Sequence, residues 1–307
     1  MATLDPVRVP YGPHPDQWAD LYLPAPGPRP GPGGRRDDGG WRGVAVVIHG
    51  GYWREKYTAE LGVPVARDLV AHGIAAWNLE YRRAAADGPG GTPTAGDGGW
   101  PATFLDVAAG IDRLADVAGL GVLADDDAAR LAGVLSAGRV VGLGHSAGGH
   151  LAVWAAGRHR LPAGAPGAAP DGATPDGAAG AGPRVALRGV VSQAGVLSLA
   201  EAEARGLSNH AARNLMGGAS ADSAELARAF ALADPMCALP IGVPVHAVHS
   251  RDDEAVPFAL SEDYVAAARA AGDPAVLHVT TGDHRAVIDP GHEAYRLCRS
   301  LVEELLG

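Results

Sequence analysis

The segment from Val140 to His150 constrains the fold more than any other part of this chain. It reads VVGLGHSAGGH, so an apolar β-like run leads into a G-x-S-x-G turn and then into an alanine-rich stretch. In this arrangement a strand ends, the chain turns sharply and a helix begins directly after the serine. Such a turn strains the backbone of Ser146, so the flanking Gly144 and Gly148 must be small. We therefore predict a nucleophile elbow with Ser146 as the attacking residue.

Apolar runs alternate with amphipathic segments along most of the chain, which is typical of an α/β protein. A pair of short strands is expected within residues 1–23, followed by strands at 43–48, 74–79, 138–145, 185–191, 243–249 and 275–280. Helices are expected at about 58–72, 102–118, 147–158, 259–271 and 291–306. The run GVAVVI at 43–48 is apolar throughout, as in a strand buried on both faces of a parallel sheet. We expect one domain over residues 1–307, with a mostly parallel central sheet and helices on both faces.

Three stretches rich in proline and glycine interrupt this alternation, at residues 24–42, 84–99 and 161–183. We predict that they are surface loops within the domain and that 161–183, which is of low complexity, is disordered. Residues 196–235 are expected to be mostly helical and to lie where a cap over the site could form.

Composition limits the classes of partner that this chain is expected to bind. The chain carries a formal charge of −10 and no basic run, which argues against a nucleic-acid partner and against binding to an anionic membrane. Cys237 and Cys298 are its only cysteines and lie far apart, as expected for free thiols in a reducing compartment. The sequence has neither the apolar core of a signal peptide nor an apolar run of about 18 residues. We expect a cytoplasmic protein that acts on a small molecule, with a homodimer left open.

A serine hydroxyl needs a base, a group that orients the base, and donors for the oxyanion. In the α/β-hydrolase fold these residues follow the order serine, acid, histidine. The acid should come just after the strand that ends at His249, where Asp252, Asp253 and Glu254 are adjacent. The spacing alone leaves Asp252 and Asp253 nearly equal and makes Glu254 the weakest of the three.

The base must come later in the chain, where His278, His284 and His292 remain. His278 falls in a predicted strand, which favours a core or edge position. His292 falls in the first turn of the last helix, which favours a solvated position. His284 follows the last predicted strand in the turn TGDH, from which a side chain can project over the elbow. We predict His284 as the base.

The oxyanion donors are expected at two places. Ala147 begins the helix after the serine, where backbone N–H groups have no intrahelical acceptor. The sequence HGGYW at 49–53 follows an early buried strand, and its glycines let the backbone approach a substrate oxygen closely. We therefore predict Gly51, Tyr52 and Ala147 as the donors.

We expect neither a metal nor a cofactor. His246 and His249 are three residues apart on a predicted strand, so they point to opposite faces and do not chelate one ion. The sequence contains no H-E-x-x-H motif, and neither a P-loop nor a G-x-G-x-x-G motif follows a predicted strand.

Several motifs together resemble the α/β-hydrolase esterase and lipase superfamily, and most of all its kynurenine formamidase type: HGGYW (49–53), EYRR (80–83), GHSAGGHL (144–151), HSRDDEAVP (249–257) and DHRAVIDP (283–290). The D-x-x-V-P pattern of that family implies Asp253 as the acid. The resemblance also implies Tyr52, Trp53 and His150 as residues of the substrate site.

The resulting hypothesis is a metal-independent serine hydrolase. It would cleave a small aryl-formamide or carboxylic ester through an acyl-enzyme. Three alternatives are kept: a general carboxylesterase acting on acetyl or feruloyl esters, a biosynthetic tailoring hydrolase or acyltransferase, and a non-catalytic scaffold on a hydrolase fold.

Overall fold

A computed structural model describes residues 5–25, 41–85, 97–168 and 183–307. In these residues eight strands form one sheet in the order β1-β2-β4-β3-β5-β6-β7-β8. The strands β1 and β2 are antiparallel to their neighbours, and all pairs from β4 to β8 are parallel. Their bounds are Val7–Pro10 (β1), Trp18–Tyr22 (β2), Gly43–Ile48 (β3), Ile74–Leu79 (β4), Val140–His145 (β5), Val190–Gln193 (β6), Val245–Ser250 (β7) and Ala275–Thr280 (β8).

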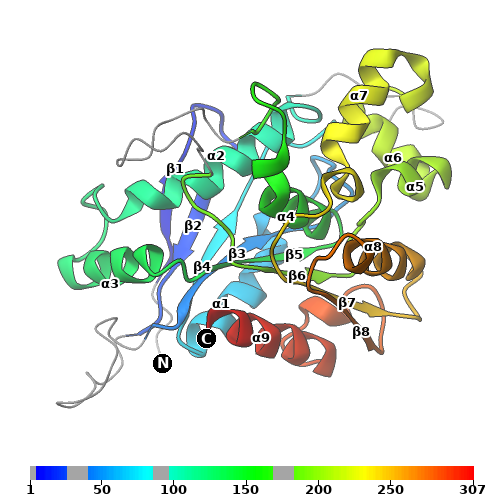
Figure 1. Ribbon diagram of the computed structural model, residues 1–307. Coiled ribbons are helices and arrows are strands. Elements are labelled where there is room, and N and C mark those ends of the chain that lie inside the picture. The colour runs from blue at the N-terminus through cyan, green and yellow to red at the C-terminus, as the bar shows by residue number, and fades with distance from the viewer. Residues whose placement is uncertain (1–4, 26–40, 86–96, 169–182) are drawn as a thin grey trace.

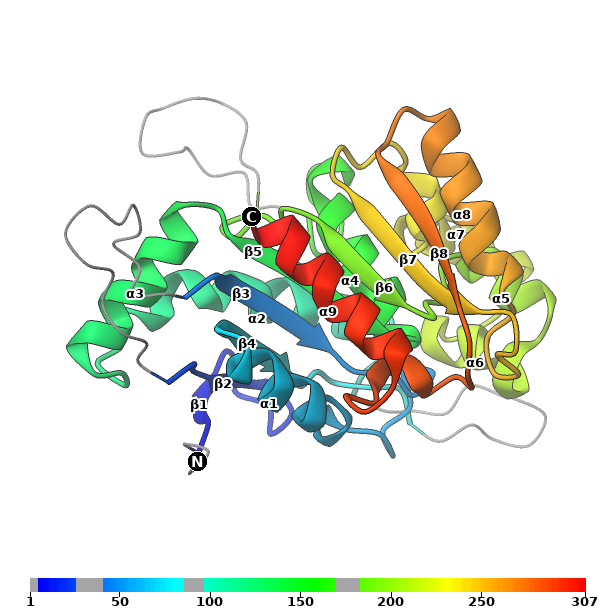
Figure 2. The ribbon, with the colours of Figure 1, turned by 90° about the horizontal axis from the view of Figure 1, so that it is seen from below.

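Helices cover both faces of the sheet, as Figures 1 and 2 show. One face packs against α1 (Val63–Ala71) and α9 (Glu293–Leu306). The other packs against α2 (Ala102–Val117), α3 (Asp125–Ser136), α4 (Ala147–Gly157) and α8 (Ala259–Ala270).

Alternation along each strand divides the core into two layers, because successive side chains of a strand point to opposite faces. In β3, Val44 and Val46 pack in the layer that holds α4, whereas Ala45 and Val47 pack in the layer that holds α1 and α9. Burial of apolar side chains on both faces explains why this strand is apolar throughout. The α/β-hydrolase fold class is thereby confirmed, with a mostly parallel sheet between two helical layers.

Two predicted elements differ from the structure. The strand expected at 185–191 is β6 at Val190–Gln193. Val190 pairs with Gly142 of β5, so residues 185–187 would lie opposite the turn that precedes β5, where no ladder partner exists. The helix α3 was not expected, although Asp125, Asp126 and Asp127 in its first turn favour the positive end of a helix.

The core of each proline- and glycine-rich stretch lies outside the described residues, so the predicted loops at 24–42 and 84–99 and the disorder at 161–183 remain predictions. Within 196–235 the chain is largely helical, with α5 (Leu199–Ala204), α6 (Leu207–Met216) and α7 (Ala224–Ala233). These helices form one group in Figure 1 and follow the carboxyl end of β6. Ser146 follows β5 at this same edge of the sheet.

Candidate active site

Ser146 stands at a sharp turn between β5 and α4. Its φ of 56° and ψ of −117° lie in a region that residues other than glycine rarely occupy. A Cβ on Gly144 would lie 2.1 Å from the carbonyl oxygen of Gly148, and a Cβ on Gly148 would lie 2.0 Å from that of Ile48. Both positions therefore require glycine because backbone atoms fill the space, which agrees with the spacing of the motif.

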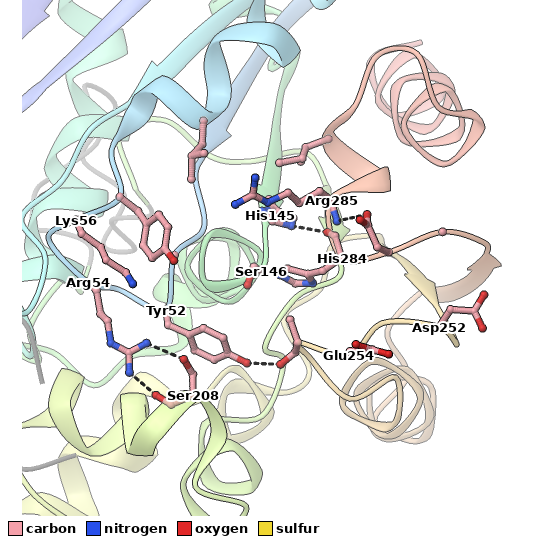
Figure 3. A pocket seen from close by; sticks show the side chains of 17 residues that line it. Tyr52, Arg54, Lys56, His145, Ser146, Ser208, Asp252, Glu254, His284 and Arg285 are labelled. Atoms are coloured by element: carbon pink, nitrogen blue, oxygen red, sulfur yellow. Dashed lines mark hydrogen bonds between the residues drawn. The ribbon is translucent and has the colours of Figure 1, made fainter. Parts of the chain in front are cut away.

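His284 and Asp253 come together beside this turn. His284 Nδ1 lies 2.7 Å from Asp253 Oδ2, and Figure 3 shows the His284 ring next to Ser146. Asp252 is exposed and points away from Ser146 (Figure 3). The geometry thus joins Asp253, and not Asp252, to the histidine.

Asp253 receives more donors than the sequence suggests. Its Oδ1 accepts the backbone N–H groups of Ala255 at 2.8 Å and Val256 at 2.9 Å. Its Oδ2 lies 3.1 Å from Nε2 of His249, a buried residue whose Nδ1 lies 2.8 Å from the Ser261 hydroxyl. Burial opposes ionisation of Asp253, but the hydrogen bonds from His249 and His284 outweigh it and lower the pKa of the carboxyl well below its usual range.

His249 is a residue that sequence reasoning did not connect with the site. The available signal was its position at the end of a strand, four residues before the acid. In the structure it contacts the same oxygen of Asp253, Oδ2, that His284 contacts.

The predicted oxyanion loop has an unusual backbone. Gly51, Tyr52 and Trp53 all have positive φ, at 115°, 51° and 57°. In the described part of the chain no protein acceptor takes the backbone N–H of Gly51, Tyr52 or Ala147. Gly51 and Tyr52 line the pocket with Ser146, and Ala147 begins α4. These three N–H groups are available to a ligand at the elbow.

The pocket over Ser146 has a volume of about 770 Å³. Tyr52 crosses one side of it, since its hydroxyl donates to the carbonyl oxygen of Ala255 at 2.5 Å, and burial raises the pKa of this hydroxyl to about 12. Arg54 bonds both the hydroxyl and the carbonyl oxygen of Ser208 at the start of α6. Charged and aromatic side chains complete the wall (Figure 3): Lys56, Tyr57, Asp252, Glu254, Asp283 and Arg285.

Two of the predicted substrate residues do not line this pocket. Trp53 and His150 are fully buried, and their rings contact each other edge to face at a centroid distance of 5.2 Å. The Phe104 ring also packs edge to face with that of His150, at a centroid distance of 5.7 Å. The structure does not place Trp53 and His150 at this pocket, because their rings are buried in the core, so their role in substrate binding stays a prediction. Tyr52 alone of the three faces the pocket.

The other histidines weighed as the base lie elsewhere. His278 is on β8, and its Nε2 lies 2.9 Å from Nδ1 of His246 on β7. His292 caps α9 by accepting the backbone N–H of Ala294. Among the described residues no group of three or more His, Cys, Asp or Glu side chains is arranged to hold a metal ion, and no helix is long and apolar enough to cross a membrane.

Burial of His150 makes the stability of the protein depend on pH. Burial lowers the pKa of this ring to about 4, whereas an unfolded histidine titrates at about 6.5. Between these values the unfolded chain binds a proton that the native state does not, so stability falls as pH falls, by about 1.4 kcal/mol per pH unit.

We expect the variant His150→Gln to lose this contribution, because its amide can still donate to the carbonyl oxygen of Ala233 but does not titrate. Urea unfolding between pH 4.5 and 6 should give a pH slope that is smaller than in the wild type by about 1.4 kcal/mol per unit. An unchanged slope at constant m-value would contradict the prediction.

Comparison with known proteins was consistent with this geometry. Residues 37–267, well over half of the chain, match the family described as BD-FAE, an esterase family of the α/β-hydrolase type. The chain belongs to the BD-FAE family. No curated protein matches the sequence.

Solved structures share the fold of this BD-FAE protein at low sequence identity. An acetyl ester-xyloside bifunctional hydrolase from Caldicellulosiruptor lactoaceticus has a TM-score of 0.64 at 19% identity, covering 99% of this chain and 97% of its own. Esterase 2 from Thermogutta terrifontis, phosphoramylated by tabun, has a TM-score of 0.63 at 18% identity, covering 100% and 95%.

A bifunctional GH43-CE protein from Bacteroides eggerthii has a TM-score of 0.65 at 20% identity over 97% of this chain. The present chain spans only 35% of the length of that protein. The resemblance to kynurenine formamidases is not supported by any of these comparisons, which favour the carboxylesterase alternative.

Proposed function

We propose that this protein is a serine esterase that hydrolyses small carboxylic esters through an acyl-enzyme. The observation that carries the proposal is the juxtaposition of Ser146, His284 and Asp253 at one pocket, beside a loop with free N–H groups. Membership in an esterase family supports the same reaction class.

The reaction follows from the roles that these groups can take. His284 removes the proton of Ser146 as the hydroxyl oxygen attacks the ester carbonyl carbon, while Asp253 holds the other ring nitrogen and stabilises the charged imidazole. The N–H groups of Gly51, Tyr52 and Ala147 stabilise the oxyanion. His284 then protonates the departing alcohol. A water molecule, deprotonated by His284, attacks the acyl-enzyme and releases the acid.

The pocket favours an ester with a polar alcohol over an aryl-formamide. Charged side chains make up much of the wall, and such groups can hydrogen-bond the hydroxyl groups of a polar alcohol. The solved relative from C. lactoaceticus is named for an acetyl ester and a xyloside. We therefore propose acetyl esters of hydroxyl-rich, sugar-like alcohols as the substrate class.

A panel of substrates tests this assignment. We expect p-nitrophenyl acetate and an acetylated xyloside to be cleaved with kcat/KM of about 10⁴ M⁻¹s⁻¹ or more, the ordinary range for enzymes. N-formylkynurenine should react at least about tenfold more slowly, which is the loss in kcat/KM expected when one favourable contact with the substrate is missing. The variant Ser146→Ala serves as the background. Faster cleavage of the formamide would overturn the substrate class, and failure to cleave any ester would overturn the function.

A further inference from the structure

The carboxylate of Glu80 is buried and contacts both ends of the loop that runs from His49 to Ala59. Glu80 directly follows β4 and is 1% exposed. Its Oε1 lies 3.1 Å from Nε2 of His49, and its Oε2 accepts the backbone N–H of Ala59 at 2.9 Å. The segment between these contacts carries Gly51 and Tyr52, so its two ends are tied to a single side chain.

The neighbouring residue Tyr81 holds the first end a second time. Its hydroxyl donates to the carbonyl oxygen of His49 at 2.9 Å. Its ring stacks on the His49 ring with a centroid distance of 4.4 Å and an interplanar angle of 14°. Tyr81 thus sets the position of the carbonyl that immediately precedes Gly50.

The negative charge of Glu80 is compensated within the same cluster. Glu80 Oε1 accepts the backbone N–H of Tyr81 at 3.0 Å and bonds Nη1 of Arg83. Arg83 also donates to Asp16 at 3.1 Å. A buried carboxylate with this many donors has a strongly preferred position, because any shift leaves a charge without a partner.

The loop needs such external support. Three consecutive residues, Gly51 to Trp53, have positive φ, and two of them carry side chains that disfavour this conformation. Strain of this kind persists only where the surroundings hold the backbone in place. Neither Glu80 nor Tyr81 lines the pocket, so both act on a substrate only through the loop.

We propose that Glu80 and Tyr81 are positioning residues that aim the N–H groups of Gly51 and Tyr52 at the oxyanion. The inference rests on the proposed esterase function. It goes beyond that function because it assigns transition-state stabilisation to a cluster outside the pocket. Loss of the cluster should therefore weaken stabilisation of the oxyanion and leave binding of the uncharged ester nearly unchanged.

The test compares Tyr81→Phe and Glu80→Gln with the wild type. Tyr81→Phe removes only the hydroxyl, and we expect kcat for p-nitrophenyl acetate to fall about tenfold with KM within about twofold. Glu80→Gln replaces an acceptor by a donor at one end of the loop, and we expect a loss in kcat of about 10²-fold, comparable to losing one oxyanion donor. A trifluoromethyl ketone, which forms a tetrahedral oxyanion adduct with serine, should bind more weakly by the same factors.

Tyr295→Phe is the matched control. Tyr295 is also fully buried, and its hydroxyl bonds Asp68 at 2.9 Å between α9 and α1, in the core layer on the other face of the sheet. Its loss should lower the Tm by an amount similar to Tyr81→Phe while kcat stays at the wild-type value.

The outcomes separate the two hypotheses. If the wild type cleaves esters but Tyr81→Phe and Glu80→Gln keep its kcat, or lose kcat no more than Tyr295→Phe does, the positioning role is wrong and the function stands. The positioning role is equally wrong if the variants raise KM and leave the affinity for the ketone unchanged. If the wild type is no more active than Ser146→Ala, the proposed function is wrong and the positioning role is rejected with it.

Discussion

Replacing Ser146 with alanine should lower kcat for ester hydrolysis by about 10⁵- to 10⁶-fold, because no other group can form the acyl-enzyme. The turn between β5 and α4 places this hydroxyl in the pocket, beside the His284 ring (Figure 3). Only the oxygen atom is removed, so the Tm should change little. The measurement is hydrolysis of p-nitrophenyl acetate, together with the mass increase that a reactive organophosphate gives on the wild type.

Ser192→Ala is a suitable control for this experiment. Ser192 lies on the neighbouring strand β6, is fully buried and does not line the pocket. We expect its activity to stay within about threefold of the wild type, as for a site away from the chemistry. Similar losses in both variants would mean that the effect comes from packing, and continued organophosphate labelling of Ser146→Ala would point to another nucleophile.

The second large effect concerns the acid. Asp253→Asn should lower kcat by about 10⁴-fold, because an amide presents N–H groups where the imidazole needs an acceptor and so disfavours the productive tautomer. The consequence is severe here because Oδ2 of Asp253 faces two rings, those of His284 and His249. The other oxygen, Oδ1, accepts two backbone N–H groups, so in either orientation the NH2 of an amide would face groups that donate.

Asp252→Asn makes the same chemical change one residue earlier, at an exposed side chain of the pocket wall that points away from Ser146 and does not contact His284. Its kcat should stay within about threefold of the wild type, since exposed substitutions have small effects. The ratio of the two losses is the quantity to measure, with Tm recorded for both variants. Equal losses would show that the acid is assigned wrongly.

Local chemistry made much of the fold predictable. The strand at 74–79 and the strand at 275–280 were predicted with the bounds that β4 and β8 have, because apolar side chains stand between clear turns. The strand β6 begins and ends later than the predicted strand at 185–191, because its bounds depend on the strands beside it. It pairs with β5 on one side and β7 on the other from Val190 to Gln193, and this restriction is absent from its own residues.

Some residues of the site could likewise be predicted from local sequence, and others could not. The spacing of glycines around Ser146 anticipated the elbow, since the clashes that exclude larger residues are local. The sequence did not indicate that Trp53 and His150 are buried, because aromatic and polar side chains near a catalytic motif can face either the pocket or the core. In the structure both side chains are buried in the core, where the two rings pack against each other.

By itself, the sequence determined the alternation of strands and helices, the nucleophile turn and the order in which serine, acid and histidine occur. These properties depend on short-range sterics and periodic burial, which neighbouring residues encode. Only the tertiary structure showed that Asp253 contacts His284, as the motif resemblance implied, that His249 supports this carboxylate, and that Glu80 ties together the ends of a distant loop. Those contacts join segments whose separation in space is set by the packing of the whole sheet, and no local pattern records it.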